Sequence, residues 1–341
     1  MNNSRERRSI FTACVLALVI IGPIGPSASA SIDSVKPTQS FSQVDTLGLS
    51  PDAAAQLKQA LTAHDYITAE KTLLTEIQRE PHSQRSGLLL QFLGGVYFLD
   101  HDAWHAAIAW NKAQTIAPLP PAITFSLAMA YISIGHPEWA RTVLEALEAK
   151  DSRNALYPYW LGRLDYDAHH YDLAISQFQK AIQFAPEMSQ AYDNLGLCYY
   201  RQNLNQLAVA NYQKAIDLDL KYGHPDAWPY LNLAVTERSV NQRSEAETHL
   251  REAIRLNPGL AIAHFQLGNV LEDMGQTKEA INEFQAAAHL DADYAEPHYA
   301  LARLYRQIGD SDDSKREVEN YLRIHSHHGT QVVTPPGPSE P

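Results

Sequence analysis

The sequence repeats itself with a period of 34 residues, and this periodicity constrains the fold more than any single motif does. Four consecutive units from residue 87 keep the same phase without a gap. An insertion of four residues, Gly223 to Asp226, precedes three further units, and one degraded unit precedes the first of the four. The predicted repeats are residues 50–83, 87–120, 121–154, 155–188, 189–222, 227–260, 261–294 and 295–328.

The apolar residues of each unit form two helical stripes. At about 100° per residue, positions 4, 7, 8 and 11 of a unit share one side of a first helix, and positions 20, 24 and 27 share one side of a second. Gly or Ala at position 8 lets the two helices approach closely, and we expect a larger residue to overpack them. One unit cannot bury its stripes alone, so the units are expected to stack. In residues 189–222 the stripes are Tyr192, Leu195, Gly196, Tyr199, Ala208, Tyr212 and Ala215.

These recurring residues resemble the tetratricopeptide repeat pattern, W-x2-L-G-x2-Y followed by A-x3-F and a late proline. The resemblance covers roughly four fifths of the chain and implies an all-α, right-handed α-solenoid of about eight helix-turn-helix repeats. It also implies that the first helices line a concave groove, which contacts an extended peptide or a partner helix. The departures are mild, since tyrosine or histidine replaces the Trp and the last unit has Ser314 and Val318 in place of Ala and Phe.

Residues 1–30 have the layout of an export signal: a basic start at residues 5–8, an apolar run of 12 residues and small residues at 28–30. A spanning helix needs about 20 apolar residues, so we expect cleavage before Ser31 and no stable membrane insertion afterwards. An uncleaved anchor is the alternative, and Arg7 and Arg8 also resemble a twin-arginine export signal. The expected location is the periplasm, with an extracellular or membrane-anchored protein as alternatives. Residues 31–49 are predicted to be a flexible linker and residues 329–341 a disordered tail.

The charge and the cysteines exclude some classes of partner and of bond. The chain carries a net charge of −12, and loss of the leader removes a net two positive charges and leaves −14. Such a chain is expected to avoid nucleic acid and anionic lipid surfaces. Cys14 lies in the leader, so Cys198 alone would remain and no intramolecular disulfide can form. We expect Cys198 to be a buried, unreactive thiol.

No catalytic motif is present, which predicts a protein without enzymatic activity and without a cofactor. The chain has 15 histidines, and several of them fall in the turns between the two helices of a unit. Neighbouring units stand about 10 Å apart, whereas zinc ligands lie about 2.1 Å from the metal. We therefore interpret His101, His136, His169 and His170 as solvated turn residues rather than as a metal site. A metal-binding or enzymatic protein that uses this histidine-rich edge is the less favoured alternative.

The other side of each first helix carries the candidate binding residues. Positions 2, 5, 9, 12 and 13 lie away from the packing stripe, yet they are rich in aromatic residues and arginine, the types enriched at binding hot spots. No lysine occupies position 5, so the groove differs from the family's carboxylate clamp. The candidate groove residues are Phe125, Met129, Tyr159, Arg163, Tyr166, Asp193, Tyr200, Arg201, Trp228, Arg238, Phe265, Asn269, Tyr299, Arg303 and Arg306.

The sequence therefore predicts an exported, non-enzymatic interaction scaffold that binds a peptide or an envelope protein through the groove. A self-associating structural component of an envelope assembly, and hence a homo-oligomer, is the alternative. Burial of the apolar half of the groove by neighbouring units or by the N-terminal segment also stays open. The insertion is interpreted as a corner of the solenoid, where Asp226 caps the helix that carries Trp228.

Overall fold

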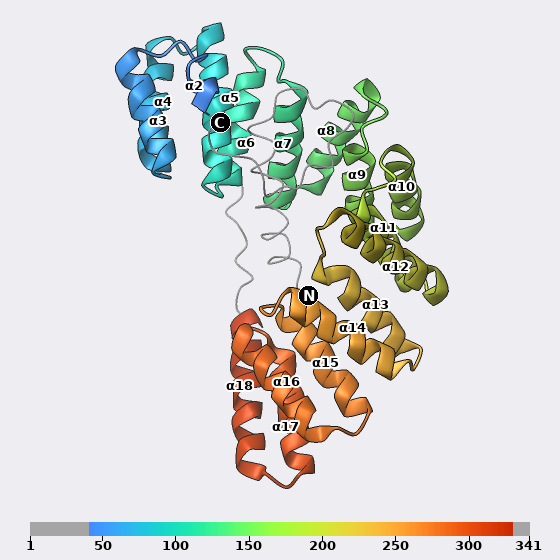
Figure 1. The fold of residues 1–341 in the computed structure, drawn as a ribbon. Coiled ribbons are helices and arrows are strands. Elements are labelled where there is room, and N and C mark those ends of the chain that lie inside the picture. The colour runs from blue at the N-terminus through green and yellow to red at the C-terminus, as the bar shows by residue number, and fades with distance from the viewer. Residues whose placement is uncertain (1–40, 330–341) are drawn as a thin grey trace. The chain divides into compact units, whose positions relative to one another are not determined.

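The computed structural model describes residues 41–329, and the chain divides into two compact units, with the boundary between Glu187 and Met188. Every regular element in this described range is a helix. The helices follow one another as antiparallel pairs, each joined by a tight turn (Figure 1). The prediction of an all-α array of helix-turn-helix repeats is confirmed.

The N-terminal unit consists of one short helix and four helix pairs. In each pair, and between each pair and the next, the helices pack against one another. The short helix is α2 (Phe41–Val44), and the pairs are α3 (Pro51–Thr62) with α4 (Tyr66–Arg79), α5 (Gln84–Leu99) with α6 (Ala103–Gln114), α7 (Pro121–Ser133) with α8 (Pro137–Lys150), and α9 (Leu156–Asp167) with α10 (Tyr171–Phe184).

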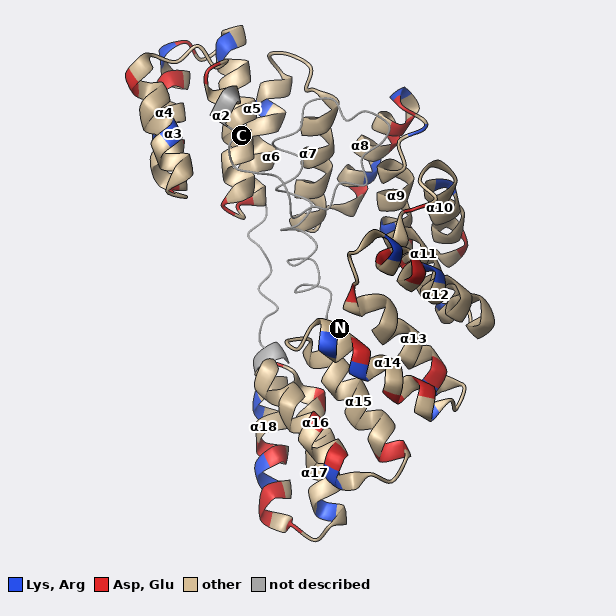
Figure 2. Cartoon of the chain, in the orientation of Figure 1, with Lys and Arg blue, Asp and Glu red and all other residues tan. Residues whose placement is uncertain are grey.

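The C-terminal unit consists of four further pairs. The first helices of its first three pairs also contact one another in succession. Charged residues gather along the last helix (Figure 2). The pairs are α11 (Ser189–Arg201) with α12 (Asn205–Tyr222), α13 (Ala227–Ser239) with α14 (Arg243–Leu256), α15 (Ala261–Asp273) with α16 (Thr277–Leu290), and α17 (Ala295–Gln307) with α18 (Ser311–Gly329).

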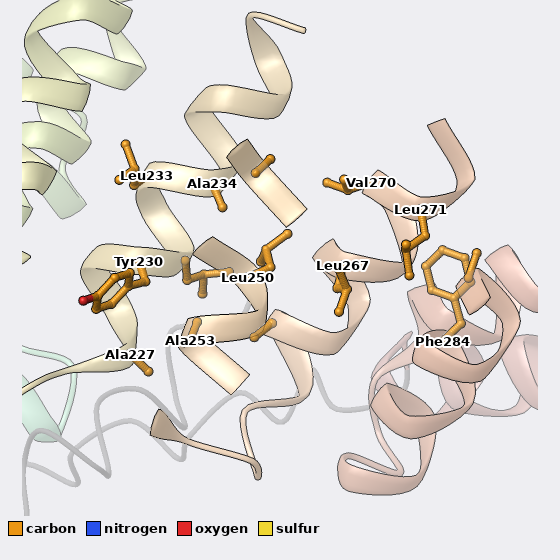
Figure 3. Close-up of a cluster of buried hydrophobic side chains, with 14 of the residues drawn as sticks. Ala227, Tyr230, Leu233, Ala234, Leu250, Ala253, Leu267, Val270, Leu271 and Phe284 are labelled. Carbon is orange, nitrogen blue, oxygen red and sulfur yellow. The ribbon is translucent and has the colours of Figure 1, made fainter. Parts of the chain in front are cut away.

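The core of the C-terminal unit is one continuous layer of apolar side chains. Leu250, Leu267 and Phe284 come from the consecutive helices α14, α15 and α16 and belong to the same buried cluster (Figure 3). In the N-terminal unit a second cluster joins α3 to α6 and includes Val44 and Leu47. Residues 41–49, which the sequence analysis places in a linker, thus pack on the first repeat, because both side chains are apolar and the end of the repeat stack offers apolar surface.

Small and large residues are matched where the two helices of a repeat touch. A Cβ atom on Gly94 would lie 2.3 Å from Nε1 of Trp110, which itself donates a hydrogen bond to the Gln91 carbonyl at 2.9 Å. Wherever position 8 is Gly, position 24 is aromatic; wherever position 8 is Ala, position 24 is Leu or Val. The pairs are Gly94–Trp110, Gly162–Phe178, Gly196–Tyr212 and Gly268–Phe284 in the first class, and Ala128–Leu144, Ala234–Leu250 and Ala302–Val318 in the second.

The turn inside each repeat explains the histidines at position 15. This residue has a positive φ in all eight repeats, a conformation that glycine adopts freely and that asparagine and histidine tolerate better than other residues. The histidines therefore serve the backbone of the turn. The residues and their φ values are His64 (53°), His101 (61°), Gly135 (83°), His169 (63°), Asn203 (60°), Asn241 (68°), Gly275 (76°) and Gly309 (85°).

The four-residue insertion lengthens a helix and not a loop. Helix α12 has 18 residues, whereas α10 and α14 have 14 each, so the insertion adds about one helical turn. Gly223 ends α12 with a φ of 76°. The loop that follows is as long as the one before α11, and Asp226 caps α13 by accepting a hydrogen bond from the Trp228 N–H at 3.2 Å. The corner inferred from the sequence is thus an ordinary linker after an extended helix.

Candidate binding surface

The candidate groove residues lie on the first helices of the repeats, and we call this surface the first-helix face. It comprises positions 2, 5, 9, 12 and 13 of α7 and α9 in the N-terminal unit, and of α11, α13, α15 and α17 in the C-terminal unit. In each unit, packing between neighbouring helices determines which of the candidate side chains still reach the surface.

Most of the candidates in the N-terminal unit are buried. Phe125 and Met129 on α7 belong to the core, and the Phe125 ring lies 6.1 Å from that of Tyr157 on the next first helix. Tyr159 is buried against Phe178, with ring centroids 5.9 Å apart. These three side chains stabilise the packing and offer little surface to a ligand.

Two candidates of the N-terminal unit remain half-buried, Arg163 and Tyr166 on α9. The Arg163 guanidinium carbon lies 5.9 Å from the centre of the Trp160 ring, a cation–π contact that holds the side chain along its own helix. The apolar half of the predicted groove is therefore largely core, and this unit contributes few free groups to the first-helix face.

Polar candidates in the C-terminal unit link successive first helices. Asp193 on α11 accepts hydrogen bonds from Asn232 Nδ2 on α13 at 2.9 and 3.2 Å. Arg238 on α13 pairs with Asp273 on α15 at 2.6 Å. We call this series of contacts between neighbouring first helices the polar ladder.

Arg303 on α17 adds the last contact of the polar ladder, since it pairs with Glu272 on α15 at 2.5 Å. Partly exposed ion pairs of this kind contribute at most about 1 kcal/mol each. Their larger effect is to fix the spacing of the helices. Asp193, Arg238 and Arg303 are candidates from the sequence, and their partners Glu272 and Asp273 occupy positions 12 and 13. Asn232 was missed because it lies at position 6, outside the positions counted.

The aromatic candidates of the C-terminal unit differ in how far they are covered. Phe265 packs on Phe284 and Tyr294, with ring centroids 5.6 and 5.2 Å away. Phe265, Tyr200 and Trp228 are half-buried, and Tyr299 is 60% exposed. Each of the four first helices thus presents an aromatic side chain that is at least partly accessible.

The remaining polar candidates are Arg201 and Arg306, which are exposed at the ends of α11 and α17, and Asn269, which is half-buried on α15. Asn269 Nδ2 donates to Gln266 Oε1 on the same helix at 3.5 Å. Arg201 and Arg306 occupy positions 13 and 12, at the same end of their helices. The face thus combines aromatic rings at positions 2, 5 and 12 with arginines at positions 12 and 13.

Histidines of the last three repeats form carboxylate pairs between first and second helices. His249 pairs with Glu237 at 2.8 Å, His264 with Glu283 at 2.7 Å, and His298 with a glutamate of α18 at 2.6 Å. The Glu283 carboxylate raises the pKa of His264 above its ordinary value, although burial opposes this. Within residues 41–329, no cluster of three or more His, Cys, Asp or Glu side chains is arranged to hold a metal ion.

Cys198 is fully buried in α11, and burial raises the pKa of its thiol to about 12. A thiol that stays protonated is a poor nucleophile and a poor metal ligand. The side chain acts as a small apolar residue of the core.

The comparisons with known proteins agree with this geometry. Three family models described as tetratricopeptide repeat match residues 187–258, 231–295 and 271–329. The chain is a tetratricopeptide repeat protein. It resembles the BBSome complex member BBS4 of Xenopus tropicalis with 30% identity over 121 residues, which are 35% of this chain and 22% of that protein.

Solved structures with the same architecture cover more of the chain. A tetratricopeptide repeat protein from Parabacteroides merdae aligns with 77% of this chain and 98% of its own, at a TM-score of 0.61 and 16% identity. The Cut9–Hcn1 hetero-tetramer aligns with 85% of this chain and 56% of its own, at a TM-score of 0.58 and 15% identity. At such identities the likeness shows the fold alone.

The chain spans between 22% and 40% of the length of the first three curated relatives that it matches. Their activities therefore do not transfer to it. Among residues 41–329, no helix combines the length and the apolar character that crossing a membrane requires. Residues 1–30, on which the export prediction rests, lie outside this range, as do residues 330–341 of the predicted tail.

Proposed function

We propose that this tetratricopeptide repeat protein is a non-enzymatic interaction scaffold, and that the first-helix face of its C-terminal unit binds a peptide segment of a partner protein. One observation carries the proposal. Tyr200, Trp228 and Tyr299 present aromatic surface from three separate first helices, although a solvated helix face needs no aromatic residues. Such rings contribute most of the binding energy in many interfaces.

The polar ladder supports the proposal by keeping these rings at fixed distances. Contacts of 2.9, 2.6 and 2.5 Å join the four first helices from Asp193 to Arg303. A surface that is ordered before binding loses less conformational entropy when it takes up its ligand. The exposed Arg306 at the edge of the face favours a peptide that carries a carboxylate beside its apolar residues.

A peptide library displayed on phage and selected on the purified protein tests the binding proposal. We expect the enriched peptides to share an apolar residue and a carboxylate. For a synthetic copy of one such peptide, Tyr299→Ser and Arg306→Glu are each expected to raise Kd at least about tenfold. Both side chains are exposed, so circular dichroism should show an unchanged fold. Tyr159 is unsuitable for this test because it is buried.

Leu290→Ser is the matched control, since it removes an exposed leucine from the end of α16, away from the first-helix face. Its Kd for the selected peptide should equal that of the unaltered protein. Equal Kd values for all four proteins would show that the peptide binds elsewhere, and the proposal would then fail.

The second part of the proposal is export, with the partner in the cell envelope. It rests on the basic start, the 12-residue apolar run and the small residues at 28–30. N-terminal sequencing of the protein from fractionated cells tests it. We expect a mature chain that begins at Ser31 in the envelope fraction; an intact Met1 in the cytosolic fraction would contradict export.

A further inference from the structure

The N-terminal unit carries a row of exposed apolar side chains on its second helices. Each of its four second helices presents one large apolar residue in its first turn: Ile67 on α4 is 63% exposed, Trp104 on α6 53%, Trp139 on α8 46% and Leu173 on α10 57%. We call this row the apolar edge. It runs along the side of the unit where the turns of the repeats lie.

Packing of the repeats does not require the apolar edge. The fifth repeat has Leu207, 46% exposed, at one of these positions. In the last three repeats the same positions hold the pairs Ser244 and Glu245, Lys278 and Glu279, and Asp312 and Asp313. The architecture therefore accepts charged residues here. A contiguous row of exposed apolar side chains in a soluble unit marks an interaction site when its own fold does not need it.

The rim of the apolar edge is acidic. Asp65 and Asp102 cap α4 and α6 by accepting hydrogen bonds from the N–H groups of Thr68 and His105, and Glu138 lies in the first turn of α8. Two of these carboxylates pair with histidines, Asp102 with His105 at 2.6 Å and Glu138 with His136 at 3.1 Å. Lys71 lies one turn after Ile67 on α4, and Arg141 on α8 pairs with carboxylates of its own. Acidic side chains thus outnumber lysine and arginine beside the apolar row.

The expected spacing of the apolar edge suits an α-helix. Helices packed side by side stand about one helix diameter, roughly 10 Å, apart, and an α-helix advances about 10.5 Å in seven residues. One apolar residue per heptad of a partner helix would therefore meet one residue of the apolar edge, and three heptads would span the four repeats. Lysine or arginine beside these residues would face the acidic rim.

We propose that the apolar edge docks a cationic amphipathic helix of a partner protein. Binding buries Trp104, Trp139 and their neighbours in the row, while the carboxylates of the rim select basic flanks on the helix. Trp139 is already held in place by His136, whose ring is stacked on it at 3.8 Å, so this anchor is ordered before the helix arrives.

The probe for the test is a fluorescein-labelled peptide of three heptads, with leucine at the first and fourth positions of each heptad and lysine elsewhere. We expect it to bind the full chain in a fluorescence anisotropy titration, and added salt to weaken the binding because it screens the rim. Trp104→Ser combined with Leu173→Ser is expected to raise Kd at least about tenfold. Both residues are exposed, so the thermal melt should not change.

The matched control is Leu220→Ser combined with Tyr222→Ser. It removes a leucine with the same 57% exposure and an exposed aromatic ring, but from the last turn of α12 in the C-terminal unit. Kd should stay at the value of the unaltered protein. An equal loss of affinity in the test and control variants would overturn the proposal, as would equal binding of a peptide with glutamate in place of every lysine.

Two further results would assign the apolar edge to a different occupant and so overturn the proposal. One is a dimer in sedimentation equilibrium that the Trp104 and Leu173 variant dissociates, which identifies a second copy of this chain. The other is flotation with vesicles of phosphatidylcholine and phosphatidylglycerol that the same variant abolishes, which identifies a membrane surface.

Discussion

The match between positions 8 and 24 predicts that Gly196→Ala lowers the free energy of unfolding. A Cβ atom there would lie 2.6, 2.8 and 3.0 Å from Cε1, Cδ1 and Cζ of Tyr212. Carbon atoms in contact are normally about 3.5–4.0 Å apart, so the ring must move by roughly 1 Å. Tyr212 is fully buried, and its surroundings resist such a shift.

Two opposing effects set the size of the change in the free energy of unfolding. Overpacking a core contact costs about 1–3 kcal/mol, while replacing a glycine inside a helix with alanine gains about 1 kcal/mol. Gly196→Ala should therefore lower stability by at most about 2 kcal/mol. Gly196→Val adds a branched side chain and should lower it further.

Whether Gly196→Ala raises or lowers the free energy of unfolding depends on the residue at position 212. Tyr212→Leu removes the ring, and together with Gly196→Ala it gives the Ala and Leu pair already present as Ala234 and Leu250. In that background Gly196→Ala keeps its gain in helix propensity and meets no ring, so it should raise stability by up to about 1 kcal/mol. The coupling free energy between the two sites is then about 1–3 kcal/mol.

Urea unfolding of the four proteins, followed by circular dichroism, measures this coupling. Ala234→Gly is the control, because it lies in the second class of pairs and should only lose stability, by about 1 kcal/mol from helix propensity plus the cost of a small cavity. If Gly196→Ala stabilises both backgrounds equally, the close contact does not limit the residue at position 8, and the reasoning is wrong.

Three further predictions concern single residues. Because His101 has a φ of 61°, His101→Asn should leave the melting temperature nearly unchanged, whereas His101→Val should lower stability by about 1–3 kcal/mol in thermal unfolding. The raised pKa of His264 means that its protonation favours the folded chain, so this stabilisation is complete below about pH 6.5 and is lost as the pH rises through the folded-state pKa. His264→Gln should therefore narrow the difference between urea midpoints at acid and alkaline pH, and an undiminished difference would exclude the pair as its source. Cys198 should react with a thiol reagent at neutral pH only after denaturation, since it is buried and the pKa of its thiol is about 12; rapid labelling of the native protein would contradict its burial.

The repeat phase was sufficient to predict the helix pairs and their core. Once the period is known, position 8 and position 24 of every unit are fixed, and Gly94 and Trp110 or Gly268 and Phe284 meet in the structure as the phase requires. The assignment of positions is reliable because the pattern recurs, so that a unit with an atypical residue can still be aligned from the units beside it. The sequence also placed His101 and His169 in the turns, whereas the positive φ at position 15 was found only in the structure.

The insertion and the binding surface could not be derived in full. A shift of four residues fits both a longer loop and one more turn of helix, and only the structure shows that α12 continues to Tyr222. Helical geometry places Phe125 and Tyr159 outside the packing stripe of their own helices but does not reveal that Tyr157 and Phe178 cover them. Which candidates stay exposed depends on contacts between helices, and a period contains no information about those.

The matched pairs also determine where this chain can be cut and rejoined. The two members of a pair lie 16 residues apart, on different helices of one repeat. A chimera joined between those helices would set Ala128 against an aromatic ring or Gly94 against a leucine, giving a clash in the first case and a void in the second. Chimeras joined in the linkers between repeats keep both members together. For protein engineers the exchangeable module is therefore the whole repeat, and the single helix is not a module.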